Sequence, residues 1–206
     1  LLDEKRLKQA IDTLAEGIDQ LQEWALRTRF TEMQTAYRYM LDYMRQGMPD
    51  PDRERLHAEL IGRCYIINDQ VAIARLTEHS TKVYCQMRRK YKSLTVLGGI
   101  YDRLKENAAN FAVTESLPAN ECKSVRLQLS QEHERLLSEL FSAIWSSTGW
   151  NKGDAELIDR IICDDEISLT DRATAVSAIT LSTLKCFEPL KIEALCNRVC
   201  TEQYLF

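Results

Sequence analysis

Apolar residues near the start of the chain recur at alternating spacings of four and three, which place side chains on one face of an α-helix. The stripe consists of Leu7, Ile11, Leu14, Ile18, Leu21 and Ala25. It predicts one helix over residues 3–27. Only seven glycines and four prolines occur in 206 residues. Since strand-rich folds need more turn residues, we predict an all-α fold.

A second helix is predicted to begin at Thr31, because Gln34 follows three residues later in the arrangement of a capping box. It should end at Gly47, since glycine adopts the left-handed conformation that closes a helix without Cβ strain. Asp50 and Pro51 then suit an N-cap followed by a first-turn proline. A third helix should therefore start at this point.

Two dipeptides leave boundaries open in the middle of the chain. Asn68–Asp69 could divide the third helix, and Gly98–Gly99 could break or kink a later one. Residues 107–120 show no clear periodicity, so they form the best candidate boundary between domains. We therefore predict an N-terminal helical subdomain over residues 1–110 and a second helical subdomain over residues 121–206.

Capping residues also predict the helices of the C-terminal part. A strong amphipathic helix should end near Gly149, and Asp154 should cap the next helix. Ser168 has Asp171 three residues later, which predicts an N-cap pairing at the start of another helix. Pro189 should open the last helix.

Residues 155–186 predict two helices joined by an acidic turn. The first helix carries Leu157, Ile158 and Ile161, the turn is Asp164, Asp165 and Glu166, and the second helix contains the small residues Ala173, Ala175, Ser177 and Ala178. This segment resembles a HEAT repeat. In HEAT and armadillo proteins, small residues in the second helix let neighbouring repeats approach closely. The resemblance implies an α-solenoid of stacked antiparallel helix pairs, HEAT-like or tetratricopeptide-like.

The apolar residues after Pro189 suggest the first helix of a further repeat, which leads us to expect a fragment of a longer repeat protein. They are Leu190, Ile192, Leu195 and Val199, and the chain reaches Phe206 before a second helix. A terminal repeat needs a polar outer face, whereas this chain ends on Tyr204, Leu205 and Phe206. The N-terminal half shows no self-similarity at a period of thirty to forty residues.

Cysteine usage and hydropathy bear on location. Seven cysteines without close paired spacing favour reduced thiols and a cytoplasmic protein. No apolar run is long enough to cross a bilayer, and the first thirty residues lack a signal-peptide pattern, so no membrane contact is predicted. The chain begins at Leu1 rather than Met, and a removed targeting segment would leave the same start.

Candidate metal, nucleotide and catalytic residues do not form a known motif. Cys196 and Cys200 lie four apart, but no histidine accompanies them, so no metal is predicted. Gly98–Gly99 lacks the lysine and the third glycine of phosphate loops. The three histidines, His57, His79 and His133, stand on separate predicted helices, although His79 could still meet Cys85 in the fold. We predict no catalytic residue, no cofactor and no enzyme activity.

A basic and aromatic run over residues 82–92 is the most suggestive candidate binding surface. It consists of Lys82, Tyr84, Arg88, Arg89, Lys90, Tyr91 and Lys92, with no acid among them. Basic side chains neutralise phosphates and aromatic rings stack on bases, so nucleic-acid binding is one hypothesis. A solvated helix face opposite a core stripe of Val83, Met87 and Tyr91 explains the same residues. Acidic residues between 154 and 171 could meet this basic run within the fold or between chains.

Function is predicted from the helices and from the lack of a catalytic motif. The preferred hypothesis is a non-enzymatic helical-repeat scaffold that binds another protein. Alternatives are a nucleic-acid binder using residues 82–92 and a helical enzyme whose site is assembled only by the fold. Homodimerisation through the first helix is a further possibility, because its stripe fits a short heptad. We prefer packing of that stripe on the second helix.

Overall fold

The structure is a computed structural model that describes residues 6–47, 51–91, 93–116 and 118–199. Within these ranges every regular element is helical and no strand occurs, which confirms the predicted all-α fold. The chain divides into two compact units, unit 1 (Leu1–Ser80) and unit 2 (Thr81–Phe206). No helix of the described residues is both long and apolar enough to cross a bilayer.

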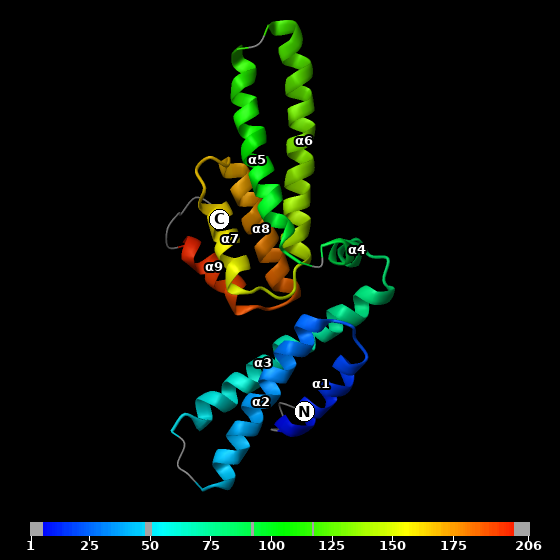
Figure 1. Ribbon diagram of the computed structural model, residues 1–206, viewed down its shortest axis with the longest axis vertical. Coiled ribbons are helices and arrows are strands. Elements are labelled where there is room, and N and C mark those ends of the chain that lie inside the picture. The colour runs from blue at the N-terminus through cyan, green and yellow to red at the C-terminus, as the bar shows by residue number, and fades with distance from the viewer. Residues whose placement is uncertain (1–5, 48–50, 92, 117, 200–206) are drawn as a thin grey trace. The chain divides into compact units, whose positions relative to one another are not determined.

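Unit 1 contains three helices, α1 (Leu7–Asp19), α2 (Trp24–Arg45) and α3 (Arg53–His79), and α1 and α2 both pack against α3 (Figure 1). Most of the apolar stripe predicted for the first helix, from Leu7 to Leu21, is buried in the core of this unit, whereas Ala25 is exposed. The buried part of the stripe packs in one cluster with Met33, Leu60 and Cys64, and the Met33 Sδ lies 3.6 Å from the Cys64 Sγ. The stripe is therefore used for packing within the unit, and this occupies the seam proposed for a coiled-coil dimer.

The predicted helix over residues 3–27 is wrong at its end, because α1 stops at Asp19 and α2 begins at Trp24. The guanidinium of Arg27 donates to the carbonyl oxygens of Leu21, at 2.9 Å, and Asp19, at 3.2 Å. These bonds satisfy carbonyl groups left free where α1 ends. Thr31 lies inside α2 and is not an N-cap; its hydroxyl donates to the Arg27 carbonyl at 2.9 Å.

Other predicted boundaries of unit 1 have mixed outcomes. Gly47 directly follows α2 and its C-cap residue with a φ of 67°, as predicted for a closing glycine. α3 starts at Arg53 and runs through Asn68–Asp69 without a division. The N-cap predicted at Asp50 lies outside the described residues.

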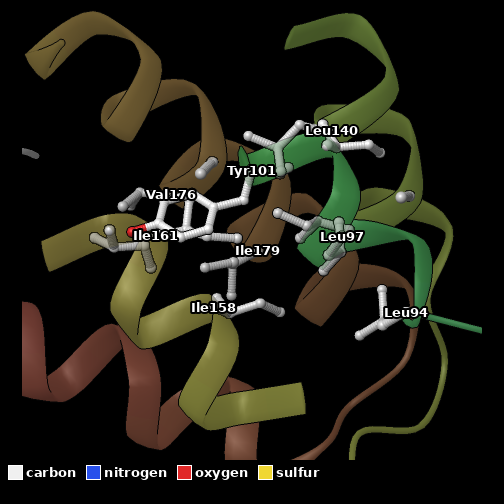
Figure 2. Packing of buried hydrophobic residues seen from close by; sticks show 14 of the residues in the cluster. Leu94, Leu97, Tyr101, Leu140, Ile158, Ile161, Val176 and Ile179 are labelled. Atoms are coloured by element: carbon white, nitrogen blue, oxygen red, sulfur yellow. The ribbon is translucent and has the colours of Figure 1, made fainter. Parts of the chain in front are cut away.

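Unit 2 contains α4 (Val83–Lys90), α5 (Val96–Val113), a short 3₁₀ helix η1 (Thr114–Ser116), α6 (Ala119–Ser146), α7 (Lys152–Cys163), α8 (Leu169–Lys185) and α9 (Pro189–Val199). α5 packs along α6, α6 packs on α8, and α7, α8 and α9 contact one another. Figure 2 shows the core between them, where the Tyr101 ring lies beside Val176 and Ile161.

Residues 107–120, which we expected to separate two subdomains, instead close the hairpin of α5 and α6. This hairpin extends beyond α7, α8 and α9 (Figure 1). Polar contacts hold its arms together: the Asn107 amide donates to the Leu129 carbonyl at 3.1 Å, and Arg126 Nε donates to the Thr114 hydroxyl at 2.9 Å. Polar pairing across the arms explains why apolar periodicity fades here. The division into compact units falls at Ser80 instead.

The helix starts of unit 2 follow the predicted capping residues closely. Asp154 is the N3 residue of a capping box whose N-cap is Asn151, so the predicted cap was displaced by three positions. Ser168 accepts from the Asp171 N–H, as predicted, and α9 begins at Pro189, as predicted. Gly98 and Gly99 lie within α5, which continues through them.

Candidate interaction surface

The predicted basic and aromatic run lies on α4, and its aromatic residues face inward. Tyr84 is only 8% exposed and Tyr91 only 6% exposed. The Tyr84 ring stands edge-on to Trp145 with centroids 5.2 Å apart, and the Lys185 ammonium lies 5.8 Å from its centre. Burial raises the pKa of the Tyr84 hydroxyl to about 12. These rings are therefore not available to stack on bases.

Helical periodicity explains how the rest of the run divides. Tyr84, Arg88 and Tyr91 share the buried face of α4, whereas Val83, which we assigned to the core stripe, is exposed. Lys82, Arg89 and Lys90 are exposed. Lys92 lies outside the described residues. The seven predicted surface residues therefore do not form one surface.

The acidic turn between α7 and α8 is neutralised by α5 and α8 rather than by the basic run, and Asp165 pairs with Arg172 of α8. The Tyr101 hydroxyl donates to Asp164, and the Lys105 ammonium lies 3.2 Å from the Asp164 carboxylate and 2.6 Å from that of Glu166. The Tyr101 hydroxyl, the Glu166 N–H and Lys105 together lower the pKa of Asp164 below its ordinary value. Lys90 of the basic run instead lies 3.9 Å from Glu139 of α6.

A buried polar network joins the ends of α6, α8 and α9, and its centre is Lys191, whose side chain is completely buried. The Lys191 ammonium donates to the Ser147 carbonyl and the Ser182 hydroxyl, each at 2.9 Å, and to the Cys186 carbonyl at 3.3 Å. The Trp150 indole N–H donates to the Ser147 hydroxyl at 2.8 Å. Sequence reasoning missed this network, because a lysine beside apolar helix residues is typical of a solvated face.

Candidate catalytic and metal-binding residues are dispersed. His133 lies 3.1 Å from Asp171, which joins α6 to α8. His79 is exposed beside Glu78, and Cys85 is fully buried, so this thiol has none of the exposure that reactive cysteines share. Among the described residues, no three metal-ligating side chains gather. Cys200, the second member of the predicted thiol pair, lies outside those residues.

The outer face of α2 carries the largest exposed aromatic side chains of unit 1. Trp24 is 82% exposed and Tyr39 is 63% exposed. A hollow of about 610 Å³ opens over this face. We call this surface the α2 face; it comprises Trp24, Thr28, Thr31, Thr35, Ala36 and Tyr39, and the charged side chains of Arg27 and Glu32 also line the hollow.

The threonines make the α2 face less polar than its sequence suggests. The hydroxyl groups of Thr28, Thr31 and Thr35 each donate to the carbonyl four residues earlier, at 3.2, 2.9 and 2.8 Å. Each hydroxyl therefore uses its single hydrogen-bond donor within its own helix. Methyl groups and aromatic rings then supply most of the contact surface, with Arg27 and Glu32 beside them, which suits an amphipathic partner better than a purely polar ligand.

No family model, curated protein or solved structure matches the chain.

Proposed function

We propose that this protein is a non-enzymatic helical module that binds another protein through the α2 face. The observation that carries the proposal is the exposure of Trp24. Aromatic residues supply a large share of binding energy at protein interfaces. An indole left in water at the start of a helix contributes little to folding, and its apolar area is fully available to a partner.

The shape of the α2 face favours a helical partner. Trp24 and Tyr39 are fifteen positions apart on α2, which corresponds to about 22 Å along the helix. The threonines and Ala36 between them are small, with Arg27 and Glu32 beside them, so a second helix can approach the α2 backbone closely and lie between the two aromatic side chains. A partner helix with an apolar stripe would bury the threonine methyl groups and both rings.

The test is selection of a phage-displayed library of amphipathic helical peptides with the full chain. We expect enriched peptides with apolar residues at helical spacing, bound about tenfold or more weakly by Trp24→Ala. A second variant, Thr31→Arg, places a bulky charge on the exposed face and should also weaken binding about tenfold or more. Leu184→Ala removes an exposed apolar side chain of unit 2 and should leave binding unchanged. Peptides that bind all variants equally would refute the proposal.

We also propose that α7 and α8 form a HEAT-like pair within this module. In support, the acidic turn joins the two helices, and Ala175 and Ala178 of α8 are completely buried. Small side chains at these positions allow close approach between helices, as the resemblance implies. The solenoid arrangement remains part of this proposal.

A further inference from the structure

A second hollow of unit 1 lies where the start of α1, the end of α2 and the start of α3 come together. Its volume is about 410 Å³, within the range of about 300–1,000 Å³ that is typical of small-molecule sites. It shares no lining residue with the α2 face. We call it the α1–α2–α3 cavity.

Apolar side chains of α2 line one side of the cavity. Met40 is buried in the core of the unit, while Leu41 is half-buried and Met44 is exposed. Leu7 of α1 adds a buried side chain. Methionine adapts to ligands of different shape, because its side chain is unbranched and polarisable. This lining suits an alkyl chain or an aromatic ring.

Cationic and N–H-donating side chains surround that apolar lining. Lys8, Arg53 and His57 come from two different helices, and no carboxylate lines the cavity among the described residues. Within those residues, none of the three makes a hydrogen bond or an ion pair with the protein. A neutral histidine still offers one N–H donor. Arg6 also lines the cavity and has an interaction of its own, so the donors left for a ligand are those of Lys8, Arg53 and His57.

Helix dipoles add to this positive field. Lys8 lies in the first turn of α1, which has no acidic residue, and Arg53 is the first residue of α3. A cation at a helix N-terminus is unfavourable, whereas an anion there is stabilised. Acids also stand nearby: Asp52 is the N-cap residue before Arg53, Glu54 lines an adjoining hollow with Arg53 and His57, and Asp12 acts on Tyr37 in the cavity wall. Removing the negative charge of Glu54 therefore tests whether the cavity prefers an anionic ligand.

We infer that the α1–α2–α3 cavity binds an amphiphilic anion, a carboxylate or phosphate attached to an apolar chain or ring. The anionic group would lie among Lys8, Arg53 and His57, and the apolar part would lie against Met40, Leu41 and Met44. Such a group could come from a free small molecule or from the headgroup region of an anionic lipid, and the chemistry is the same in both cases.

Methionine-methyl NMR of the full chain locates the ligand. With ¹³C-methyl-labelled methionine, titration of decanoate or decyl phosphate below micelle formation should shift the Met40 and Met44 signals. Met33, which is buried in unit 1, and Met87, which is half-buried in unit 2, serve as internal references. Decanol, which has no charge, and inorganic phosphate, which has no chain, should each bind at least about tenfold more weakly. Equal binding of decanol, or shifts at Met87 alone, would overturn the inference.

Charge variants test the rim. Lys8→Gln and Arg53→Gln should each weaken decanoate binding about fivefold, the effect of one exposed ion pair, and Glu54→Gln should strengthen it. Lys123→Gln, an exposed change on α6, is the matched control. Co-sedimentation with phosphatidylglycerol but not phosphatidylcholine vesicles would identify a lipid headgroup as the source, provided that Lys8→Gln reduces it. If the rim variants keep both decanoate binding and vesicle sedimentation, the proposed site is excluded.

Discussion

Units 1 and 2 differ in the polar groups that they bury. Among the described residues, unit 1 buries only uncharged polar side chains, Gln70 and Thr77, beside an apolar core. Unit 2 buries five charged side chains as well as serines and threonines; the charged ones are Arg88, Asp171, Arg172, Glu188 and Lys191. Unit 1 is thus held mainly by apolar packing, and unit 2 also depends on buried hydrogen bonds.

This difference affects how each unit responds to mutation. An apolar core loses stability in proportion to the volume removed. A buried polar network loses more when a single member is removed, because its partners are left without hydrogen bonds in a medium of low dielectric constant. The two units should therefore respond differently to substitutions of similar size.

Lys191→Met should have the largest effect. The substitution keeps the length of the side chain but leaves the carbonyls of Ser147 and Cys186 without this donor. We expect the free energy of unfolding of unit 2 to fall by about 4 kcal/mol. Urea denaturation, combined with amide hydrogen exchange in α8, would measure the loss. Lys152→Met is the exposed control, and a loss below about 1 kcal/mol for Lys191→Met would show that the network is not a stabilising feature.

Met33→Ala tests the apolar core of unit 1. Met33 is completely buried and contacts Cys64. Truncation should leave a cavity and lower the free energy of unfolding by about 3 kcal/mol, measured by hydrogen exchange in α2 and α3. Met33→Leu conserves most of the volume and should lose less than about 1.5 kcal/mol. If both variants were equally unstable, shape rather than volume would govern this core.

Asp164→Asn should have a smaller effect that depends on pH. The pKa of Asp164 is lowered, chiefly by the Tyr101 hydroxyl, so its stabilisation is present above the ordinary value of 3.8 and is lost as the pH falls through the folded value. Asparagine still accepts these hydrogen bonds but has no charge, so we expect a loss of about 1 kcal/mol at pH 7.

Thermal unfolding of the wild type and of Asp164→Asn between pH 7 and pH 3 would check this expectation. The two curves should converge at the acidic end. Asp102→Asn, an exposed change on α5, controls for general charge effects. A difference in stability that stays constant down to pH 3 would contradict the assignment of the effect to the Asp164 charge.

Trp24→Ala should have the smallest effect on stability. Because most of the Trp24 side chain is in water, its removal should change the free energy of unfolding by less than about 0.5 kcal/mol. Urea denaturation at several protein concentrations measures this. A loss above about 1 kcal/mol that grows with concentration would mean that another copy of the chain covers the indole.

Most helices were predictable from apolar periodicity, because burial against neighbours requires it. Gly47 and Pro189 also marked boundaries correctly, since their backbone preferences are local. The turn between α1 and α2 was not predictable from the same signals. It contains neither glycine nor proline, and Arg27 closes it through contacts that exist only after the chain folds. At Gly98–Gly99 the sequence suggested a break or kink, but α5 continues through both glycines, because packing of α5 on α6 outweighs their weak helix propensity.

The candidate surfaces were less predictable than the helices. Residues 82–92 were chosen for composition, but the period of α4 turns Tyr84, Arg88 and Tyr91 inward. Lys191 gave no signal, because two of its three acceptors are backbone carbonyls, which no residue type marks, and one of these belongs to Ser147, 44 positions away. The α2 face was hidden by its threonines, which look polar in sequence but bond back to their own helix.

The unequal burial of the tryptophans gives the protein built-in optical labels. Trp24 is the single tryptophan of unit 1, and Trp150, in unit 2, is almost completely buried. An indole in water emits at longer wavelength than one in an apolar interior and is more accessible to a dissolved quencher. Acrylamide should therefore quench the red edge of the emission first, so that the α2 face can be followed without attaching a dye.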